Sequence, residues 1–238
     1  MSERTVIMSR IILKLSGEAL AGDDGTGFGP ERIRGVASQV KALTEQKYEV
    51  GIVIGGGNFI RGRSTKEIER TKADSIGMLA TVMNCIYVSE MFRNEGMETV
   101  VMTPFQVGSF TKLFSRDLAN EYFAKGAVVF FAGGTGHPFF STDTGVVLRA
   151  IEVGAEVILM AKNVDGVYDS DPVKNPDAIR YDILPIQDVI DKNLQAVDMT
   201  ASILARDYRM PMRVFDLKEE GSIVKAASGN FNGTTITV

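Results

Sequence analysis

The chain has few of the residues that build disulfide frameworks and zinc sites. Cys85 is the only cysteine and His137 the only histidine among 238 residues. A disulfide within the chain is therefore excluded, as are zinc sites made from paired cysteines or clustered histidines. A basic surplus is also absent, because 26 Lys and Arg stand against 30 Asp and Glu, a formal net charge of −4. This balance argues against a protein that wraps nucleic acid, but it leaves room for a basic pocket that binds a small anion.

Long apolar segments are missing too. Runs such as residues 127–132 have about the length of a strand and fall far below the ~20 residues of a membrane span. The first ten residues, MSERTVIMSR, contain no long apolar core like that of a signal peptide. We therefore expect a cytoplasmic protein without a membrane partner.

Short β-branched runs alternate with stretches of helical character. Several runs are apolar at nearly every position, which is typical of a parallel sheet covered by helices on both faces. The alternation predicts an open α/β sandwich with a mostly parallel central sheet, in a single domain over residues 1–238. The predicted strands are residues 11–15, 50–54, 99–102, 128–132, 157–160, 213–215 and 234–238, and the predicted helices are residues 30–46, 116–124, 142–153 and 198–208.

Residues 74–92, DSIGMLATVMNCIYVSEMF, form a different kind of helical segment. Their apolar side chains go nearly all the way round the predicted helix, so it has no clear polar face. Such a helix is buried either in the core of its own domain or against another subunit. We favour the subunit contact and therefore expect a homo-oligomer.

Three glycine clusters lie at or near the ends of predicted strands. They are Ser16-Gly17, Gly55-Gly56-Gly57-Asn58 and Gly133-Gly134-Thr135-Gly136. Ligands of open α/β sheets bind beyond the carboxyl ends of the strands, and glycine lets backbone N–H groups approach phosphate oxygens there. One such cluster is more often a tight turn, but three after three apolar runs indicate a phosphate site. The P-loop, the Rossmann glycine motif and the protein kinase signatures are all absent from the sequence.

Lys14 is the most informative single residue, because it interrupts an otherwise apolar strand. A lysine there is costly to bury unless an anion pairs with it, so we favour a phosphate ligand over an outward-facing lysine. Arg61 follows the triple glycine and could reach the same anion, or it could be a solvated loop residue. The run from Ser141 to Asp143 opens a predicted helix, where it can serve as an ordinary N-cap, an anion site or both.

Four motifs in chain order carry a resemblance to a known family. They are KLSGE from Lys14, GGGN from Gly55, GTGHPFFSTD from Gly134 and VDGVYDSDP from Val164. Together they resemble the amino acid kinase superfamily and, within it, the bacterial UMP kinases, over almost the whole chain. Relatives that phosphorylate amino acids often carry a lysine near Asp198 in a Gly-Gly-Met context. Here the stretch is AVDMT, which favours the nucleotide kinase branch.

The resemblance implies ATP-dependent phosphorylation of UMP to UDP and a role for each matching residue. The catalytic positions are Lys14, Arg61, Asp143 and Asp198, the two aspartates orienting Lys14 and the magnesium that ATP brings, without direct protein ligation of the metal. The ATP positions are Lys14, Leu15, Ser16, Gly17, Gly57, Arg61, Lys162, Tyr168 and Asp171, with the last three at adenine and ribose. The UMP positions are Gly56, Asp74 (at the ribose hydroxyls), Thr135, Gly136, His137, Pro138, Phe139, Phe140, Ser141 and Thr142.

The same resemblance implies further properties. Residues 10–150 would form mainly the UMP and phosphate site, and residues 151–238 mainly the ATP site. Residues 22–29 occupy the region tied to GTP regulation in some relatives, which makes GTP and UTP candidate effectors, and the expected oligomer is a hexamer. His137 stands where the family usually has asparagine; an amide and a neutral imidazole both donate and accept hydrogen bonds, but with different geometry.

Two other functions remain open at this point. One is an acylphosphate-forming relative, such as an acetylglutamate or carbamate kinase. The other is a non-catalytic nucleotide- or oxyanion-binding protein with the same fold.

Overall fold

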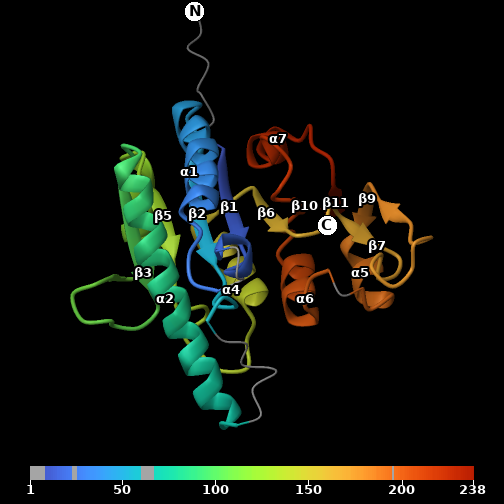
Figure 1. The fold of residues 1–238 in the computed structure, drawn as a ribbon, viewed down its shortest axis with the longest axis horizontal. Helices are drawn as coiled ribbons and strands as arrows, with labels where there is room; N and C mark the ends of the chain where they lie inside the picture. The colour runs from blue at the N-terminus through green and yellow to red at the C-terminus, as the bar shows by residue number, and fades with distance from the viewer. Residues whose placement is uncertain (1–8, 23–25, 60–66, 195) are drawn as a thin grey trace, which may run out of the picture.

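A computed structural model describes residues 9–22, 26–59, 67–194 and 196–238. Its centre is a nine-stranded sheet with the order β4-β3-β5-β2-β1-β6-β10-β11-β9, in which only the β10–β11 pair is antiparallel. The predicted mostly parallel α/β sandwich is therefore confirmed (Figure 1). The strands of this sheet are β1 Arg10–Leu15, β2 Glu49–Ile54, β3 Thr99–Thr103, β4 Lys112–Leu113, β5 Val128–Phe131, β6 Val157–Lys162, β9 Ile183–Pro185, β10 Met212–Asp216 and β11 Thr234–Thr237.

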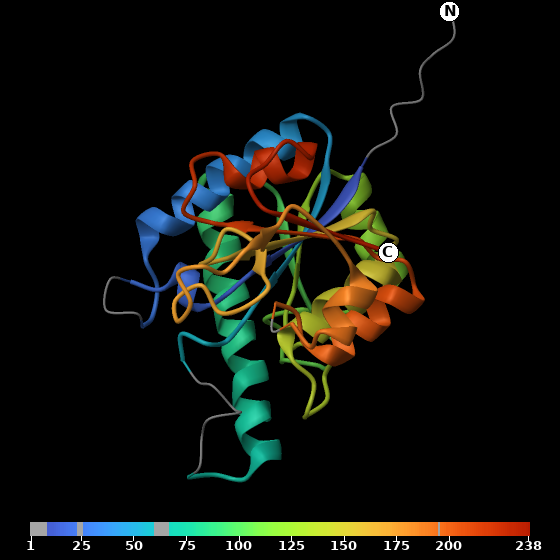
Figure 2. The same cartoon turned by 90° about the vertical axis from the view of Figure 1, so that its right-hand side faces the viewer.

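Helices cover both faces of the sheet (Figure 2). The helices are α1 Pro30–Glu45, α2 Arg70–Asn94, α3 Arg116–Ala124, α4 Thr142–Val153, α5 Ile186–Asp191, α6 Met199–Asp207 and α7 Ser222–Ser228, with a 3₁₀ turn η1 at Glu18–Leu20. One apolar core joins the sheet to α1, α2 and α7, and a second joins its other face to α3, α4, α5 and α6. A small antiparallel hairpin, β7 Val167–Tyr168 with β8 Arg180–Tyr181, lies apart from the main sheet.

Successive side chains along a strand alternate between these two cores, and this alternation decides which face of the sheet each polar side chain is on. In β1, Ile11, Leu13 and Leu15 belong to the core with α1 and α2, whereas Ile12 belongs to the core with α4 and α6. Because successive side chains of a strand point to opposite faces, Lys14 shares the face of Ile12. It therefore points toward the layer of α4.

Helix α2 is buried along one side only. It packs against β2, β3, β5 and α1, and its N-terminal half extends beyond the other helices (Figure 1). By length and composition alone it could cross a membrane, although one of its sides packs against the sheet and α1 of this domain. Its start differs from the sequence prediction, because the helix begins at Arg70 and the side chain of Glu69 caps it by accepting from the N–H of Thr71. Asp74 lies one turn inside the helix, so its expected position at the helix start is wrong.

Candidate active site

Lys14 and Asp143 form a buried ion pair at the carboxyl end of the sheet. The Lys14 ammonium lies 3.2 Å from Oδ1 of Asp143, and both side chains are less than one fifth exposed. Asp143 is in the first turn of α4, the helix that covers the face to which Lys14 points. The alternative of an outward-facing strand-end lysine is therefore wrong.

Two helix N-termini converge beside this pair. Ser141 caps α4 by accepting from the N–H of Thr144 at 3.1 Å, which confirms the predicted N-cap. Asp198 caps α6 by accepting from the N–H of Ala201 at 3.0 Å. The Asp198 carboxylate also accepts hydrogen bonds from the hydroxyls of Ser141 and Thr144, which ties the two caps together.

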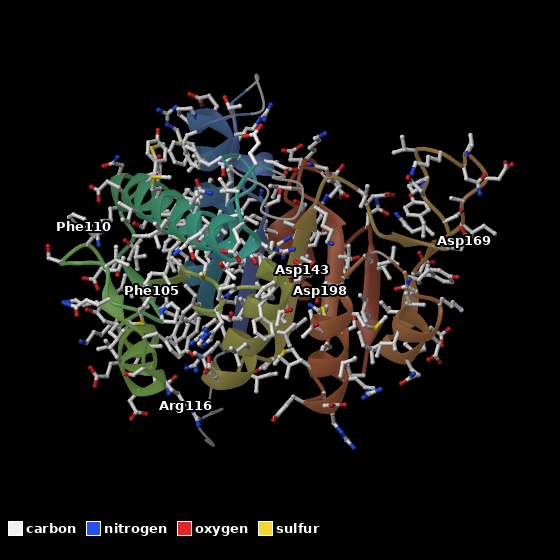
Figure 3. The ribbon with its side chains drawn as sticks, turned by 90° about the horizontal axis from the view of Figure 1, so that it is seen from below. Phe105, Phe110, Arg116, Asp143, Asp169 and Asp198 are labelled. Carbon is white, nitrogen blue, oxygen red and sulfur yellow. The ribbon has the colours of Figure 1, made fainter. Side chains whose placement is uncertain are left out.

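Figure 3 shows the consequence, with Asp143 and Asp198 next to each other near the centre of the molecule. The N-terminus of a helix favours negative charge, because its free N–H groups can donate hydrogen bonds and the positive end of the helix dipole lies there. The structure therefore brings the two predicted acidic residues together. Lys14 contacts Asp143, whereas the contacts of Asp198 are with hydroxyl groups and a backbone N–H.

Lys162 joins the same cluster from the end of β6. Its ammonium lies 4.0 Å from Oδ2 of Asp143 and donates a hydrogen bond to the carbonyl oxygen of Ala196. Burial lowers the pKa of Lys162 below the usual lysine value; the Asp143 carboxylate partly offsets this, and the charge of Lys14 adds to it. Each oxygen of Asp143 thus faces a different lysine.

The glycine clusters allow loops to approach closely around the strand ends. A Cβ on Gly17 would lie 2.6 Å from the carbonyl oxygen of Gly55, and a Cβ on Gly56 would lie 2.8 Å from that of Gly77. Real Cβ atoms do not come so near a carbonyl oxygen, so any larger residue would push these backbones apart. The first two predicted glycine clusters are therefore brought side by side.

The loop after β2 is held by two buried asparagines. Asn58 and Asn84 exchange side-chain hydrogen bonds of 2.8 and 3.0 Å, and Asn84 also donates to the carbonyl oxygen of Gly55 at 2.7 Å. Asn84 comes from the middle of α2, so the loop is fixed to that helix. Asn84 was not among the predicted site residues, although a polar amide within an apolar helix is a signal that could have identified it.

A cavity of about 180 Å³ opens between α2, the loop after β2 and the loop before α4, and we call it the loop pocket. It contains eight of the predicted site residues. Gly136, Pro138 and Phe139 are not among its lining residues. The lining residues are Gly56, Gly57, Arg70, Ala73, Asp74, Gly77, Met78, Thr81, Gly134, Thr135, His137, Phe140, Ser141 and Thr142.

Asp74 joins the two walls of the loop pocket. Its Oδ2 accepts from the guanidinium of Arg70 at 2.8 Å, one turn earlier on α2, and from the N–H of Phe139 at 2.8 Å. Phe139 has φ +72°, a conformation that is unusual for a bulky residue and common at functional sites. Arg70 was not among the predicted site residues, although its i, i+4 spacing from Asp74 is a recognisable ion-pair signal.

A second cavity of about 440 Å³ lies beside the β7–β8 hairpin, and we call it the hairpin pocket. Two predicted site residues, Tyr168 and Asp171, line it. The Tyr168 hydroxyl donates to Asp165 at 2.7 Å, which raises the pKa of Tyr168. Its lining residues are Val164, Gly166, Val167, Tyr168, Asp169, Ser170, Asp171, Pro172, Lys174, Lys192, Asn193, Leu194 and Ala196.

Other predicted positions lie on the turn after β1 or outside the described residues. The side chain of Leu15 is fully buried, so only its backbone can meet a ligand, and the hydroxyl of Ser16 accepts from the N–H of Ala19. Arg61 and residues 23–25 of the predicted regulatory loop lie outside the described residues. Within the described part of the chain, no group of three or more His, Cys, Asp or Glu could hold a metal ion.

Comparison with known proteins agrees with this architecture. The model of the amino acid kinase family matches residues 9–216. Uridylate kinase of Alcanivorax borkumensis is 41% identical over 236 residues, which cover 98% of this chain and 94% of that protein. Uridylate kinase of Pediococcus pentosaceus is 45% identical over 230 residues, 95% of each chain. The crystal structure of UMP kinase from Bacillus anthracis has a TM-score of 0.92, at 38% identity and 96% coverage of both chains. The chain therefore belongs to the amino acid kinase family and, within it, to the uridylate kinases.

Proposed function

We propose that this protein transfers the γ-phosphoryl group of ATP to UMP and forms ADP and UDP. The observation that carries the proposal is the buried Lys14–Asp143 pair, whose neighbours in the chain and in space line both pockets. Thr142, the residue before Asp143, lines the loop pocket. Lys162, the other lysine on Asp143, bonds to Ala196, which lines the hairpin pocket. A buried cation with a pocket on either side is the arrangement that phosphoryl transfer between two bound nucleotides requires.

In this proposal the loop pocket binds UMP. The N-terminus of α4 and the backbone at Gly56 would face the phosphate, because both offer N–H groups where no side chain intervenes. Asp74 would accept hydrogen bonds from the ribose hydroxyls, and the loop from Thr135 to Phe140 would contact the uracil. The acceptor phosphate has a second pKa near ~6, so at neutral pH it is largely a dianion and needs no general base.

The hairpin pocket would bind the adenosine of ATP, with Tyr168 and Asp171 at its base and ribose. The turn from Leu15 to Gly17, together with Gly57 and Arg61, would hold the phosphates. Lys14 would neutralise charge on the group in transfer, and Asp143 would keep Lys14 in position. Residues 10–150 and 151–238 then supply mainly the acceptor half and mainly the donor half of one site.

Magnesium is the metal that this chemistry implies. Mg²⁺ prefers oxygen ligands and in kinases is commonly held by substrate phosphates together with one or two carboxylates. The carboxylates of Asp143 and Asp198 lie next to each other at this site. Among the described residues, no group of three or more His, Cys, Asp or Glu could hold a metal ion without the substrate. This donor set fits a metal that enters on the ATP phosphates, where it would neutralise charge on the β- and γ-oxygens.

The exposed side of α2 supports a homo-oligomer, for which we propose a hexamer. Ile76, Leu79, Met83 and Ile86 follow one another at helical spacing, and each is between 38% and 50% exposed. Such a stripe on one helix is suited to packing against a second copy of the same helix. We also propose a cytoplasmic enzyme of pyrimidine nucleotide synthesis, with GTP and UTP as candidate effectors.

A coupled assay of ADP release tests the proposed acceptor. UMP, CMP, N-acetylglutamate and carbamate are compared at equal concentration with ATP and magnesium. We expect turnover with UMP to exceed that with the other three acceptors by at least tenfold, which corresponds to ~1.4 kcal/mol in transition-state binding. Turnover with N-acetylglutamate or carbamate alone would indicate an acylphosphate-forming enzyme. Absence of turnover with all four would indicate a binding protein.

A further inference from the structure

Asp74 uses one of its two carboxylate oxygens for both of its hydrogen bonds within the described residues. Oδ2 accepts from Nε of Arg70 and from the N–H of Phe139, each at 2.8 Å. The side chain of Asp74 is 13% exposed and lines the loop pocket. Rotation of the carboxylate would break both bonds, so together they fix the direction of Oδ1, the oxygen that carries neither bond.

Arg70 contacts both groups that meet at Oδ2. Its guanidinium is bonded to Asp74 and lies 5.7 Å from the centre of the Phe139 ring, within the range of a cation–π contact. Phe139 has φ +72°, which a bulky residue adopts only where its surroundings hold it. Arg70 therefore supports the carboxylate on α2 and the loop before α4 at the same point.

The stability of the helix does not explain an arginine at this position. Arg70 is the first residue of α2, where the positive end of the helix dipole disfavours a cation. The ion pair also has the less favourable order, with the cation four residues before the anion, and a partly exposed pair of this kind contributes little. A residue that the helix start disfavours, and that lines the loop pocket, points to a role in that pocket.

We propose that Arg70 is a positioning residue for the acceptor nucleotide. It holds Oδ2 of Asp74 and the ring of Phe139, so that Oδ1 faces the ribose hydroxyls and the loop stays against α2. The inference rests on the proposed function, in which Asp74 meets the ribose of UMP. Because hydrogen bonds depend on direction, a carboxylate that can rotate distinguishes less well between a ribose and a 2′-deoxyribose.

The test compares the steady-state kinetics of wild type, Arg70→Met and Asp74→Asn with UMP, 2′-deoxy-UMP and ATP. Arg70→Met should raise KM for UMP by roughly tenfold, because the carboxylate keeps its charge and loses its fixed direction. KM for ATP should stay within about twofold of the wild-type value and kcat within about threefold. The preference for UMP over 2′-deoxy-UMP in kcat/KM should fall toward that of Asp74→Asn.

Two further variants isolate the Arg70–Asp74 pair. Arg70→Met added to Asp74→Asn should cause little further loss of UMP affinity, because the two residues act as one unit. Lys72→Met removes a cation from the same turn of α2, but Lys72 is exposed and is not among the lining residues of the loop pocket. This control should leave all of these quantities unchanged.

An unchanged KM and an unchanged preference for UMP in folded Arg70→Met would overturn the inference, as would equal rises in the KM values for UMP and ATP. If Arg70→Met fails to fold, Arg70→Gln removes the charge with a polar side chain and is measured in the same way. A wild type that binds UMP without phosphorylating it would refute the proposed function, while calorimetry of UMP and 2′-deoxy-UMP on the same variants would still decide the role of Arg70. A wild type that binds no UMP would overturn both.

Discussion

Asn58 and Asn84 form a reciprocal pair of amide hydrogen bonds in the core, and both side chains are at most 5% exposed. Asn84→Ala would leave Oδ1 of Asn58 and the carbonyl oxygen of Gly55 without their donor, whereas Nδ2 of Asn58 would keep its hydrogen bond to the carbonyl oxygen of Gly27. A buried group left unpaired costs about 1–3 kcal/mol, so we expect the free energy of unfolding to fall by about 2–6 kcal/mol for the two groups together. Urea unfolding followed by circular dichroism measures this change.

The matched control is Asn230→Ala at an exposed position, which should change stability by less than about 0.5 kcal/mol. The double variant Asn58→Ala/Asn84→Ala should cost clearly less than the sum of the single changes, because each single change already breaks the pair. Additive losses would show that the two amides do not act together.

The buried lysine of β1 gives a second prediction. Lys14→Ala removes one charge contact to the group in transfer, so we expect kcat to fall by at least ~100-fold while the fold is retained. Steady-state rates with UMP and ATP, together with a circular dichroism spectrum, measure the two quantities. Lys125→Ala serves as the surface control. Near-normal turnover by a folded Lys14→Ala protein would remove Lys14 from the catalytic group.

Substitution of Asp74 should affect the binding of UMP and not that of ATP. Because Glu69, and not Asp74, caps α2, the substitution Asp74→Asn tests the carboxylate without a capping effect. A charged acceptor of hydrogen bonds from ribose hydroxyls contributes about 1.5–3 kcal/mol, so KM for UMP should rise roughly ten- to a hundredfold. KM for ATP should barely change, and discrimination against 2′-deoxy-UMP should weaken.

Two saturation curves, one in each substrate, measure these effects for Asp74→Asn and wild type. Glu69→Gln is the matched control, since it changes a carboxylate of the same helix that caps its first turn. It should leave both KM values unchanged. Equal shifts in the two KM values for Asp74→Asn, or no shift in either, would contradict the assignment of Asp74 to UMP.

The exposed stripe of α2 predicts the oligomeric state. Light scattering at micromolar concentration should give a mass several times the 25.9 kDa of one chain. Met83→Glu introduces a charge into the middle of the stripe and should shift the mass toward that of the monomer. Lys125→Glu, which places a glutamate away from α2, should not. A stable wild-type monomer would show that this stripe is not a subunit contact.

The buried position of Cys85 predicts that a thiol reagent reacts much more slowly with the native protein than with the unfolded chain. Cys85 is fully buried in the core with α1 and α2, and burial raises its pKa to about 12. The thiolate is the reactive form, so the native protein should react very slowly with a disulfide reagent at pH 8. The raised pKa also means that the contribution of Cys85 to stability is fully present below pH 9 and is lost as pH rises toward 12.

Absorbance of the released thiol chromophore measures this reaction in buffer and in guanidinium. The unfolded chain should release one equivalent, because it has one cysteine. Reaction of the native protein as fast as the unfolded chain would contradict the buried position of Cys85.

Local sequence patterns were sufficient to predict several elements. The predicted bounds of α3 and α4 agree with the structure, because each helix follows a serine N-cap and keeps helical periodicity to its end. The β7–β8 hairpin escaped prediction, since its strands have two residues each and show no periodicity. The start of α2 was placed four residues late, because its first turn is polar and does not continue the apolar pattern.

Long-range contacts of the site were beyond the reach of these patterns. The burial of Lys14 signalled an anionic partner, but nothing in the residues alone gave its distance from Asp143. The hydrogen bond from Phe139 to Asp74 joins residues 65 positions apart and depends on how a loop packs against α2. The resemblance assigned Lys162 to the adenine and ribose, and this assignment stays a prediction; its position beside Asp143 could not be predicted, because it depends on β6 being the neighbour of β1 in the sheet.

The central claim is that UMP accepts the γ-phosphoryl group of ATP. The most direct measurement follows both nucleotide products by anion-exchange chromatography while ATP and UMP are consumed. The account predicts that ADP and UDP appear in equal amounts, at a rate that falls at least ~100-fold in Lys14→Ala. Release of ADP without formation of UDP would contradict it.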